Sequence, residues 1–242
     1  MKEKLCRFYC YKNTRETADL KIKGMKNLEL IVFDMDGVLT DTISSWKYIH
    51  DYFNTSNERS VDEYLKGKID DDEFIRRDAS LWIENGRPIK KEKLVEILSK
   101  IPPIKGASEC IEFLKNRGIK TAIISAGLDV LAKDVGKKLG IQYVYSNGIE
   151  SDINGRLTGK GIIEVRLMYK DQTLKRLAYK LDIAFNKIAT VGNSCFDIPM
   201  FENSGFSIAF NPGDNCVRKA ADIVVEEKDL RKILPYIERF II

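Results

Sequence analysis

The chain has 242 residues, of which 44% are hydrophobic and 31% are charged. This balance is typical of a globular protein and excludes a disordered or fibrous chain, and the length allows a core domain with a smaller inserted one. No run approaches the roughly 18 consecutive apolar residues that a membrane helix needs, so we expect no membrane partner.

The net charge of +4, from 40 basic and 36 acidic residues, is confined to segment 1–24. That segment holds seven Lys or Arg residues against three acidic ones, and the rest of the chain balances to zero. We therefore predict a basic N-terminal extension over 1–24, and no nucleic-acid partner for the remainder. The extension lacks the apolar core of a secretory signal, and the five cysteines lack the spacing of a disulfide framework, so a cytoplasmic location is expected.

The first predicted element is a buried strand over 28–33, a short apolar run that ends in Asp34-Met-Asp-Gly37. A block of predicted helices follows, and Pro102-Pro103 closes it because neither residue continues a helix. These helices cover 43–53, 61–66, 71–83 and 90–99.

After this block, short apolar runs alternate with segments of helical spacing. The predicted strands cover 120–124, 142–145, 187–191, 206–210 and 222–225; the predicted helices cover 107–117, 128–139 and 173–181, and a hairpin or turn covers 151–159. Such alternation implies right-handed crossovers and a parallel sheet. We predict an α/β fold with a Rossmann-like parallel sheet in a core domain (25–42 and 104–242) and an inserted small α-helical cap domain (43–103).

Asp34 and Asp36 directly follow the first strand, where ligands bind in parallel α/β sheets. Two carboxylates at this spacing can converge on one cation such as Mg²⁺. With a phosphate on the same cation, one carboxylate can attack phosphorus and the other can protonate the leaving oxygen. The alternative is an acidic turn that caps the following helix.

Further motifs follow later strands of the predicted sheet. Ser125-Ala126-Gly127 combines a hydroxyl with free backbone N–H groups before a helix, which suits phosphate, although Ser125 could instead only cap that helix. Asn193 and Asp197 supply two further oxygen ligands. Lys170 is a candidate cation, although a lysine taken alone is more commonly solvated.

The order and spacing of these motifs over about 28–237 resemble the haloacid dehalogenase superfamily of phosphatases, and within it the phosphoserine phosphatase-like subgroup. The resemblance implies a Mg²⁺-dependent phosphomonoester hydrolase that acts on a small phosphorylated metabolite through an aspartyl-phosphate. It implies that Asp34 is the nucleophile and a metal ligand. It also implies that Asp36 is the general acid and base, with its carbonyl on the metal.

The resemblance extends to the remaining site residues. It implies a phosphate-binding set of Ser125, Ala126, Gly127 and Lys170, and two further metal ligands, Asn193 and Asp197. Lys160 is a rival for the cationic role, but the spacing to the metal motif favours Lys170.

Two departures from the subgroup's pattern concern the metal motif. The usual metal-binding Asp is Asn193 here, and the usual Asn before the final Asp is Phe196. Affinity for hard cations depends on ligand charge, so we expect weaker Mg²⁺ binding and slower turnover. The alternative function is a catalytically weakened homologue that binds a phosphorylated ligand or partner in a regulatory role.

Further departures concern the cap. The Glu and Arg that phosphoserine phosphatases use to hold the amino acid are matched by Ile43 and Asp78, although a small shift could bring in Arg76 or Arg77. We therefore expect phosphoserine to be a poor substrate. The single histidine, His50, is given no functional role, because one His cannot form a metal cluster. Trp46, Trp82 and Phe53 are interpreted as packing residues of the cap, although one of them could line the pocket.

Overall fold

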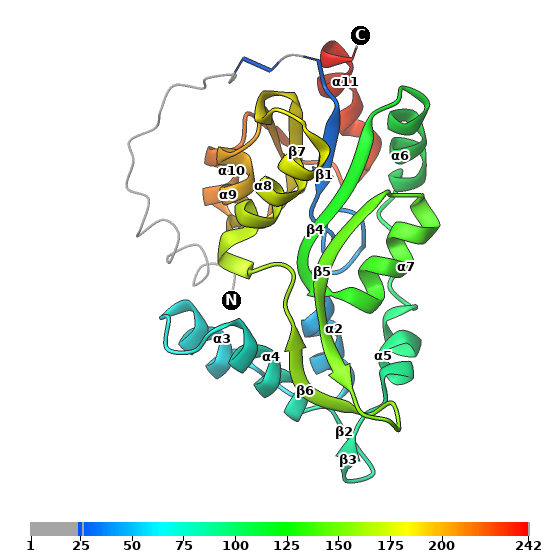
Figure 1. The fold of residues 1–242 in the computed structure, drawn as a ribbon, viewed down its shortest axis with the longest axis vertical. Helices are drawn as coiled ribbons and strands as arrows, with labels where there is room; N and C mark the ends of the chain where they lie inside the picture. Colours follow the sequence, from blue (N-terminus) through cyan, green and yellow to red (C-terminus); the bar gives the residue numbers. More distant parts are fainter. Residues whose placement is uncertain (1–23, 26, 242) are drawn as a thin grey trace.

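A seven-stranded sheet in the order β6-β5-β4-β1-β7-β8-β9 forms the centre of the computed structural model, which describes residues 24–25 and 27–241 (Figure 1). Every neighbouring pair is parallel except β5 and β6. This confirms the predicted α/β fold. The strands are β1 (Leu30–Phe33), β4 (Lys120–Leu128), β5 (Tyr143–Ser151), β6 (Leu157–Ile162), β7 (Ile188–Gly192), β8 (Phe206–Phe210) and β9 (Ile223–Val225).

Helices cover both faces of this sheet, because alternate side chains of each strand point to opposite faces. In β1, Ile31 and Phe33 join one hydrophobic cluster, and Leu30 and Val32 join another. The first cluster includes residues of α6 (Ala107–Asn116), α7 (Asp129–Leu139) and α11 (Leu234–Ile237). The second includes residues of α8 (Lys170–Leu181) and α9 (Ile198–Glu202). Helix α10 (Asn215–Ala220) packs against α9 (Figure 1).

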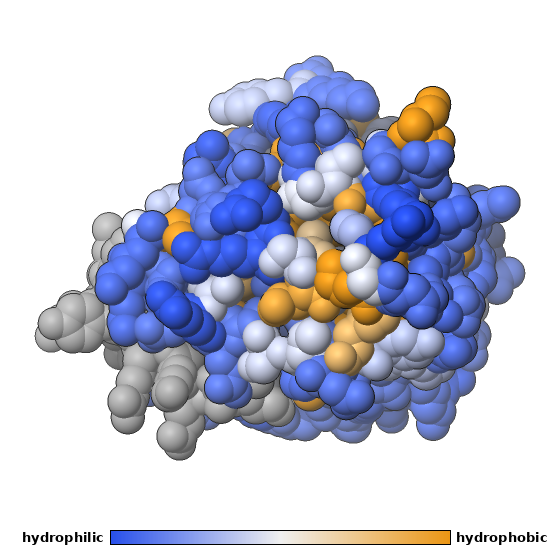
Figure 2. All heavy atoms as spheres, turned by 90° about the horizontal axis from the view of Figure 1, so that it is seen from below, coloured by the Kyte–Doolittle hydropathy of each residue, from blue (hydrophilic) through white to orange (hydrophobic). Residues whose placement is uncertain are grey.

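The predicted helical block between β1 and α6 is present beyond one end of the sheet (Figure 1). Its helices are α2 (Ser45–Tyr52), α3 (Glu58–Leu65), α4 (Asp71–Ser80) and α5 (Lys91–Leu98). The hairpin of β2 (Ile83–Glu84) and β3 (Arg87–Pro88) was not predicted, because two-residue strands carry no readable alternation. Seen from the cap end, the surface is mainly hydrophilic (Figure 2).

The hairpin of β5 and β6 reaches from the sheet to these cap helices. Strand β6 packs against α4, and near the hairpin's tip Leu157 N donates to Ile89 O (3.0 Å) and Lys91 N donates to Gly155 O (2.9 Å). The division into a core (25–42, 104–242) and a cap (43–103) stays a prediction, and the hairpin is a core segment that contacts the cap. The predicted extension 1–24 lies outside the described residues except for Gly24.

No described helix combines the length and the hydropathy that are required to cross a bilayer.

Buried Asn147 fixes the segment that leads from β6 to α8. Its Oδ1 accepts hydrogen bonds from Glu164 N (3.0 Å) and Val165 N (2.9 Å), and its Nδ2 donates to Val165 O (2.7 Å). Because α8 begins at Lys170, these bonds position the backbone just ahead of that residue.

Substitution Asn147→Ala should destabilise the protein by about 2–4 kcal/mol, because it leaves buried backbone groups without partners. Denaturant unfolding measures this loss. Asn154→Ala, on the exposed tip of the β5–β6 hairpin, is the control and should change stability by less than about 0.5 kcal/mol. Equal losses in both variants would contradict the assigned role of Asn147.

Candidate active site

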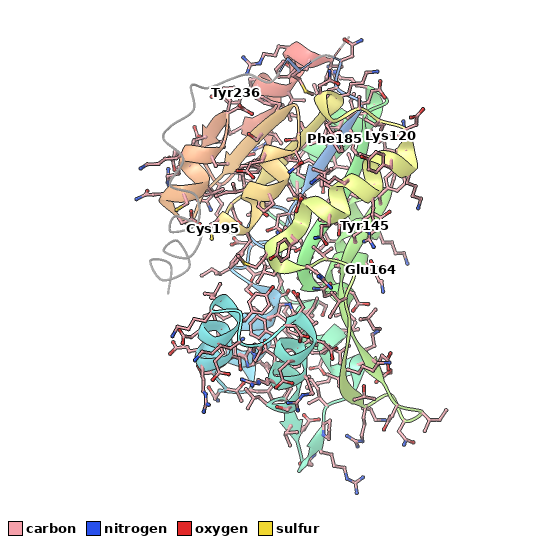
Figure 3. The ribbon with its side chains drawn as sticks, turned by 60° about the vertical axis from the view of Figure 1, so that its left-hand side comes forward. Lys120, Tyr145, Glu164, Phe185, Cys195 and Tyr236 are labelled. Atoms are coloured by element: carbon pink, nitrogen blue, oxygen red, sulfur yellow. The ribbon has the colours of Figure 1, made fainter. Side chains whose placement is uncertain are left out.

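The candidate site lies at the carboxyl ends of β1, β4 and β7, the three central strands. Lys120 at the start of β4 and Phe185 ahead of β7 lie at the far end of the sheet, whereas Cys195 after β7 lies at the end that faces the cap (Figure 3). The connection order reverses at β1, which is where open α/β sheets form a crevice for ligands.

A buried ion cluster occupies this position. Lys170 Nζ lies 3.0 Å from Asp34 Oδ1 and 2.6 Å from Asp197 Oδ1, and only 2% of Lys170 is exposed. The other oxygen of Asp197 accepts hydrogen bonds from the backbone N–H groups of Asn193 (2.9 Å) and Ser194 (3.0 Å). Asp197 therefore links the loop after β7 to the lysine that faces Asp34.

Burial and mutual charge determine the pKa values of this cluster. Burial raises the pKa of Asp34 and so does the charge of Asp197, while Lys170 opposes both. Burial alone would lower the pKa of Lys170, but the charges of Asp197 and Asp34 raise it above its ordinary value. Lys170 is therefore a permanent cation beside Asp34.

Asp36 has an environment of its own. Its Oδ2 accepts from the backbone N–H (2.8 Å) and the hydroxyl (2.9 Å) of Ser45, and its buried Oδ1 has no partner among the described residues. Burial raises the pKa of Asp36 to about 7, with the charge of Asp34 adding and the Ser45 hydrogen bonds opposing. Such a carboxyl group can give up and take back a proton near neutral pH.

The segment Ser125-Ala126-Gly127 lines the same cavity beside the two aspartates. Ser125 does not cap α7, since the N-cap residue is Leu128 and has no side-chain cap. A Cβ on Gly127 would lie 2.8 Å from Asp36 Oδ2, so only glycine allows this backbone to approach the carboxylate so closely. The Ser125 hydroxyl accepts from Gly127 N–H at 3.2 Å and also hydrogen-bonds Asp34. The role of this segment in phosphate binding stays a prediction.

The oxygen donors near Asp36 suit a hard cation. Asn193 Nδ2 lies 3.1 Å from the carbonyl oxygen of Asp36, and a turn of the amide would bring Oδ1 to that place. Gly37 (φ 78°) permits this approach, because a Cβ there would lie 2.0 Å from Asn193 Nδ2. Asp34, Asp36 and Asn193 line one cavity. The Asp34 carboxylate with the two neutral oxygens of Asp36 and Asn193 would be a donor set that fits Mg²⁺ with less ligand charge than an acidic cluster has. Among the described residues there is no group of three or more His, Cys, Asp or Glu that could hold a metal.

The other predicted site residues are placed as follows. Both oxygens of Asp197 have protein partners, so its role as a metal ligand stays a prediction. Phe196 lines the cavity and packs against the side chains of Cys195, Ile198 and Cys216. Lys160, the rival of Lys170, pairs with Glu150 and does not line the cavity.

Comparisons with known proteins decide the family. A family model of haloacid dehalogenase-like hydrolases matches residues 28–205. This chain belongs to that family. Phosphoserine phosphatase of Methanocaldococcus jannaschii is 31% identical to the chain over 215 residues, which cover 88% of this chain and 99% of the relative. Phosphoserine phosphatase of Campylobacter jejuni is 31% identical over 216 residues, which cover 87% and 100%.

Solved structures of phosphoserine phosphatases have the same fold as this chain. A substrate-bound phosphoserine phosphatase complex superimposes with a TM-score of 0.74 at 30% identity, covering 87% of this chain and 99% of that one. A phospho-aspartyl intermediate analogue of phosphoserine phosphatase gives 0.74 at 31% identity with the same coverage. The chain is therefore a phosphatase of this family, a phosphoric monoester hydrolase of the phosphoserine phosphatase-like subgroup, as the motifs predicted.

The cap contributes further residues to this cavity. The cavity, with a volume of about 730 Å³, extends from Asp34 to His50 and Asp78 on the cap helices, and both cap residues are buried. Asp78 was located from the sequence as the counterpart of the usual Arg. The roles of His50 and of Ser45, which donates to Asp36, carried no sequence signal, because they depend on partners that only folding brings near.

One further cap residue, Trp46 on α2, connects the cap to the last part of β4. Trp46 lines the cavity, and its indole N–H donates to the carbonyl of Ala126 at 2.9 Å. Trp46 thus docks α2 on the backbone of the candidate phosphate-binding loop, which is a role beyond hydrophobic packing.

The raised pKa of Asp36 predicts a pH dependence that differs between leaving groups. Asp36 is protonated below about pH 7 and ionised above it, so kcat/KM for an alkyl phosphate should fall about tenfold per unit above that value. An aryl phosphate such as p-nitrophenyl phosphate has a leaving group that needs no proton, and its profile should lack this fall. Profiles of kcat/KM between about pH 5 and 9 measure the difference, and identical falls for both esters would contradict the role of Asp36.

Proposed function

We propose that this chain is a Mg²⁺-dependent phosphomonoester hydrolase of the cytoplasm that forms an aspartyl-phosphate on Asp34 and acts on a small phosphorylated metabolite. The observation that carries the proposal is the buried Lys170 Nζ, 3.0 Å from Asp34 Oδ1. A fixed cation beside a carboxylate at the carboxyl end of β1 can neutralise the nucleophile and the phosphate that it attacks.

The chemistry takes two steps on the two aspartates. Asp34 attacks phosphorus while protonated Asp36 gives its proton to the leaving oxygen, so the P–O bond to the alcohol breaks as the bond to Asp34 forms. Ionised Asp36 then takes a proton from water, which attacks the phosphorus and releases phosphate from Asp34. Throughout, the Ser125 hydroxyl and the N–H groups of Ala126 and Gly127 bind the phosphate oxygens.

The metal would be held by the Asp34 carboxylate, the Asp36 carbonyl and the Asn193 amide oxygen, with Asp197 as a predicted fourth ligand. Mg²⁺ supplies positive charge that keeps Asp34 ionised despite its burial and that polarises the phosphate. Asn193 contributes no charge of its own, which supports the expectation of weaker metal affinity.

Two cap positions support a substrate preference that differs from that of phosphoserine phosphatases. Ile43, at the position of the usual Glu, is 75% exposed, and Asp78 replaces the usual Arg in the cavity wall. Arg76 pairs with Glu73, and neither Arg76 nor Arg77 lines the cavity. The described wall therefore offers no arginine to the carboxylate of phosphoserine, and we propose that phosphoserine is a poor substrate.

A screen of phosphomonoesters with Mg²⁺ tests whether Asp34 is the nucleophile. Asp34→Asn keeps the shape of the side chain but removes the attacking charge, so kcat should fall by more than about 10³-fold. Asp134→Asn, a charge change on a partly exposed α7 residue that pairs with Lys138 outside the cavity, is the control and should keep most activity. Activity that survives in Asp34→Asn would contradict the mechanism, and wild-type protein that binds but does not turn over any ester would favour the regulatory alternative.

The neutral side chain of Asn193 in the proposed metal site predicts a weak Mg²⁺ affinity that a carboxylate would increase. Asn193→Asp adds the missing carboxylate, so the Mg²⁺ concentration for half-maximal activity should fall by about tenfold. Titration calorimetry of the metal-free protein with Mg²⁺ gives an independent affinity. An unchanged Mg²⁺ requirement in Asn193→Asp would show that residue 193 does not contribute to metal binding.

A further inference from the structure

A buried polar cluster lies in the cap wall of the cavity. His50 on α2 and Asp78 on α4 are each 2% exposed, and both line the cavity with Asn57, which directly precedes α3. Asn57 Nδ2 donates to Asp78 Oδ2 at 2.9 Å. His50 Nε2 lies 3.4 Å from the same oxygen without forming a hydrogen bond.

Two atoms of this cluster have no hydrogen-bond partner among the described residues, Asp78 Oδ1 and His50 Nε2. Trp82 Nε1 lies 3.3 Å from His50 Nδ1. The Thr55 hydroxyl lies 2.8 Å from the same Nδ1. Because a hydroxyl can donate or accept, the contacts of Nδ1 fit either tautomer of His50. Asp78 Oδ1 is therefore an unused buried acceptor on a residue of the cavity wall. A buried polar atom without a hydrogen-bond partner destabilises the folded protein. A ligand that donates a hydrogen bond to this atom would remove the destabilisation.

The charges of the cavity lining as a whole favour a cationic or neutral group on the ligand, apart from its phosphate, over a second anionic one. Seven acidic side chains line the cavity (Asp34, Asp36, Asp41, Asp51, Glu58, Asp78 and Asp214) against three lysines (Lys47, Lys170 and Lys228). Each lysine is already paired with an acid of the same lining, Lys47 with Asp51, Lys170 with Asp34 and Lys228 with Asp41. No described lining residue thus offers an unpaired cation to a substrate carboxylate.

We propose that Asp78 is a specificity-determining residue whose Oδ1 accepts a hydrogen bond from the far end of the leaving group. This inference rests on the proposed function. The substrates are then phosphomonoesters whose leaving group carries an ammonium or hydroxyl donor and no carboxylate. Ammonium is preferred because acids outnumber lysines in the lining, and because the aromatic rings of Trp46, Tyr64 and Phe74 line the same cavity.

Asp78 also contacts residues of two other cap segments, so a structural role must be separated from a role in specificity. A structural role would lower stability and reduce turnover of every ester alike. A specificity role changes the ratio between esters that differ only in their terminal group, and this ratio is independent of how much protein is folded.

The experiment uses a series of alkyl phosphates that end in methyl, hydroxyl or ammonium, with chains of two and of four carbons. Phosphoserine completes the series, because it is aminoethyl phosphate with one added carboxylate. In the wild type, kcat/KM for the ammonium ester should exceed that for the methyl ester by about tenfold or more at one of the two lengths, with the hydroxyl ester between them. Phosphoserine should lie about tenfold below aminoethyl phosphate.

Asp78→Asn replaces one carboxylate oxygen by a donor and keeps the volume of the side chain. The ratio of ammonium to methyl ester should fall to about one, while kcat/KM for the methyl ester stays within about threefold. Asp62→Asn, a matched change on α3 whose carboxylate pairs with exposed Lys66, should leave the ratio unchanged. An unchanged ratio in Asp78→Asn would overturn the assignment.

The ester series measured on the wild-type protein tests the proposed preference for a hydrogen-bond donor even where Asp78→Asn folds poorly. Turnover of p-nitrophenyl phosphate without any preference for a donor would overturn this inference alone. Phosphoserine as the best ester would overturn this inference and the proposal that phosphoserine is a poor substrate, while the hydrolytic mechanism would stand. Failure to turn over every ester, p-nitrophenyl phosphate included, would overturn the proposed function and this inference with it.

Discussion

The burial of the Lys170 ammonium between Asp34 and Asp197 is the constraint on which the site depends. A charge so far from water is tolerated only with close opposite charges, and here they come from the end of β1 and from the loop after β7. The parallel pairing of β1 with β7 places these elements side by side, and Asp34 N donates to Val191 O at 2.9 Å. The ion cluster therefore forms only when three parts of the fold are in place at once: the register of β1 with β7, the loop after β7, and the start of α8.

The cap is part of this arrangement rather than a separate cover. Ser45 lies on the first turn of α2, donates twice to Asp36, and accepts from the backbone N–H of Leu128 at 3.0 Å. The proton-carrying group of the core is thus hydrogen-bonded by a cap residue that also contacts the end of β4. A movement of α2 would change the hydrogen bonding of Asp36, so cap position and proton transfer are coupled through one hydroxyl.

Most of the fold and the main reacting groups could be predicted because their signals are local. Buried parallel strands appear as short apolar runs, and the polar residues that follow them meet at one edge of the sheet. Asp34 and Ser125 were found in this way, whereas Lys170, ahead of a helix, was chosen from its spacing to the metal motif. The β2–β3 hairpin was too short to show a pattern, and β4, predicted to end at 124, continues to Leu128 through an irregular register. Sequence periodicity does not record such an irregularity.

The sequence by itself determined the α/β class, the family and the order of the reacting groups, because each depends on neighbours a few residues away in the chain. Only the tertiary structure decided that Asp197 faces Lys170, and that His50 and Asp78 share one wall of the cavity. His50 and Asp78 lie on different helices, and their meeting depends on how α2 and α4 pack. Helix packing follows from the fit of many side chains at once, so a single residue in the sequence carries no mark of the partner it will find.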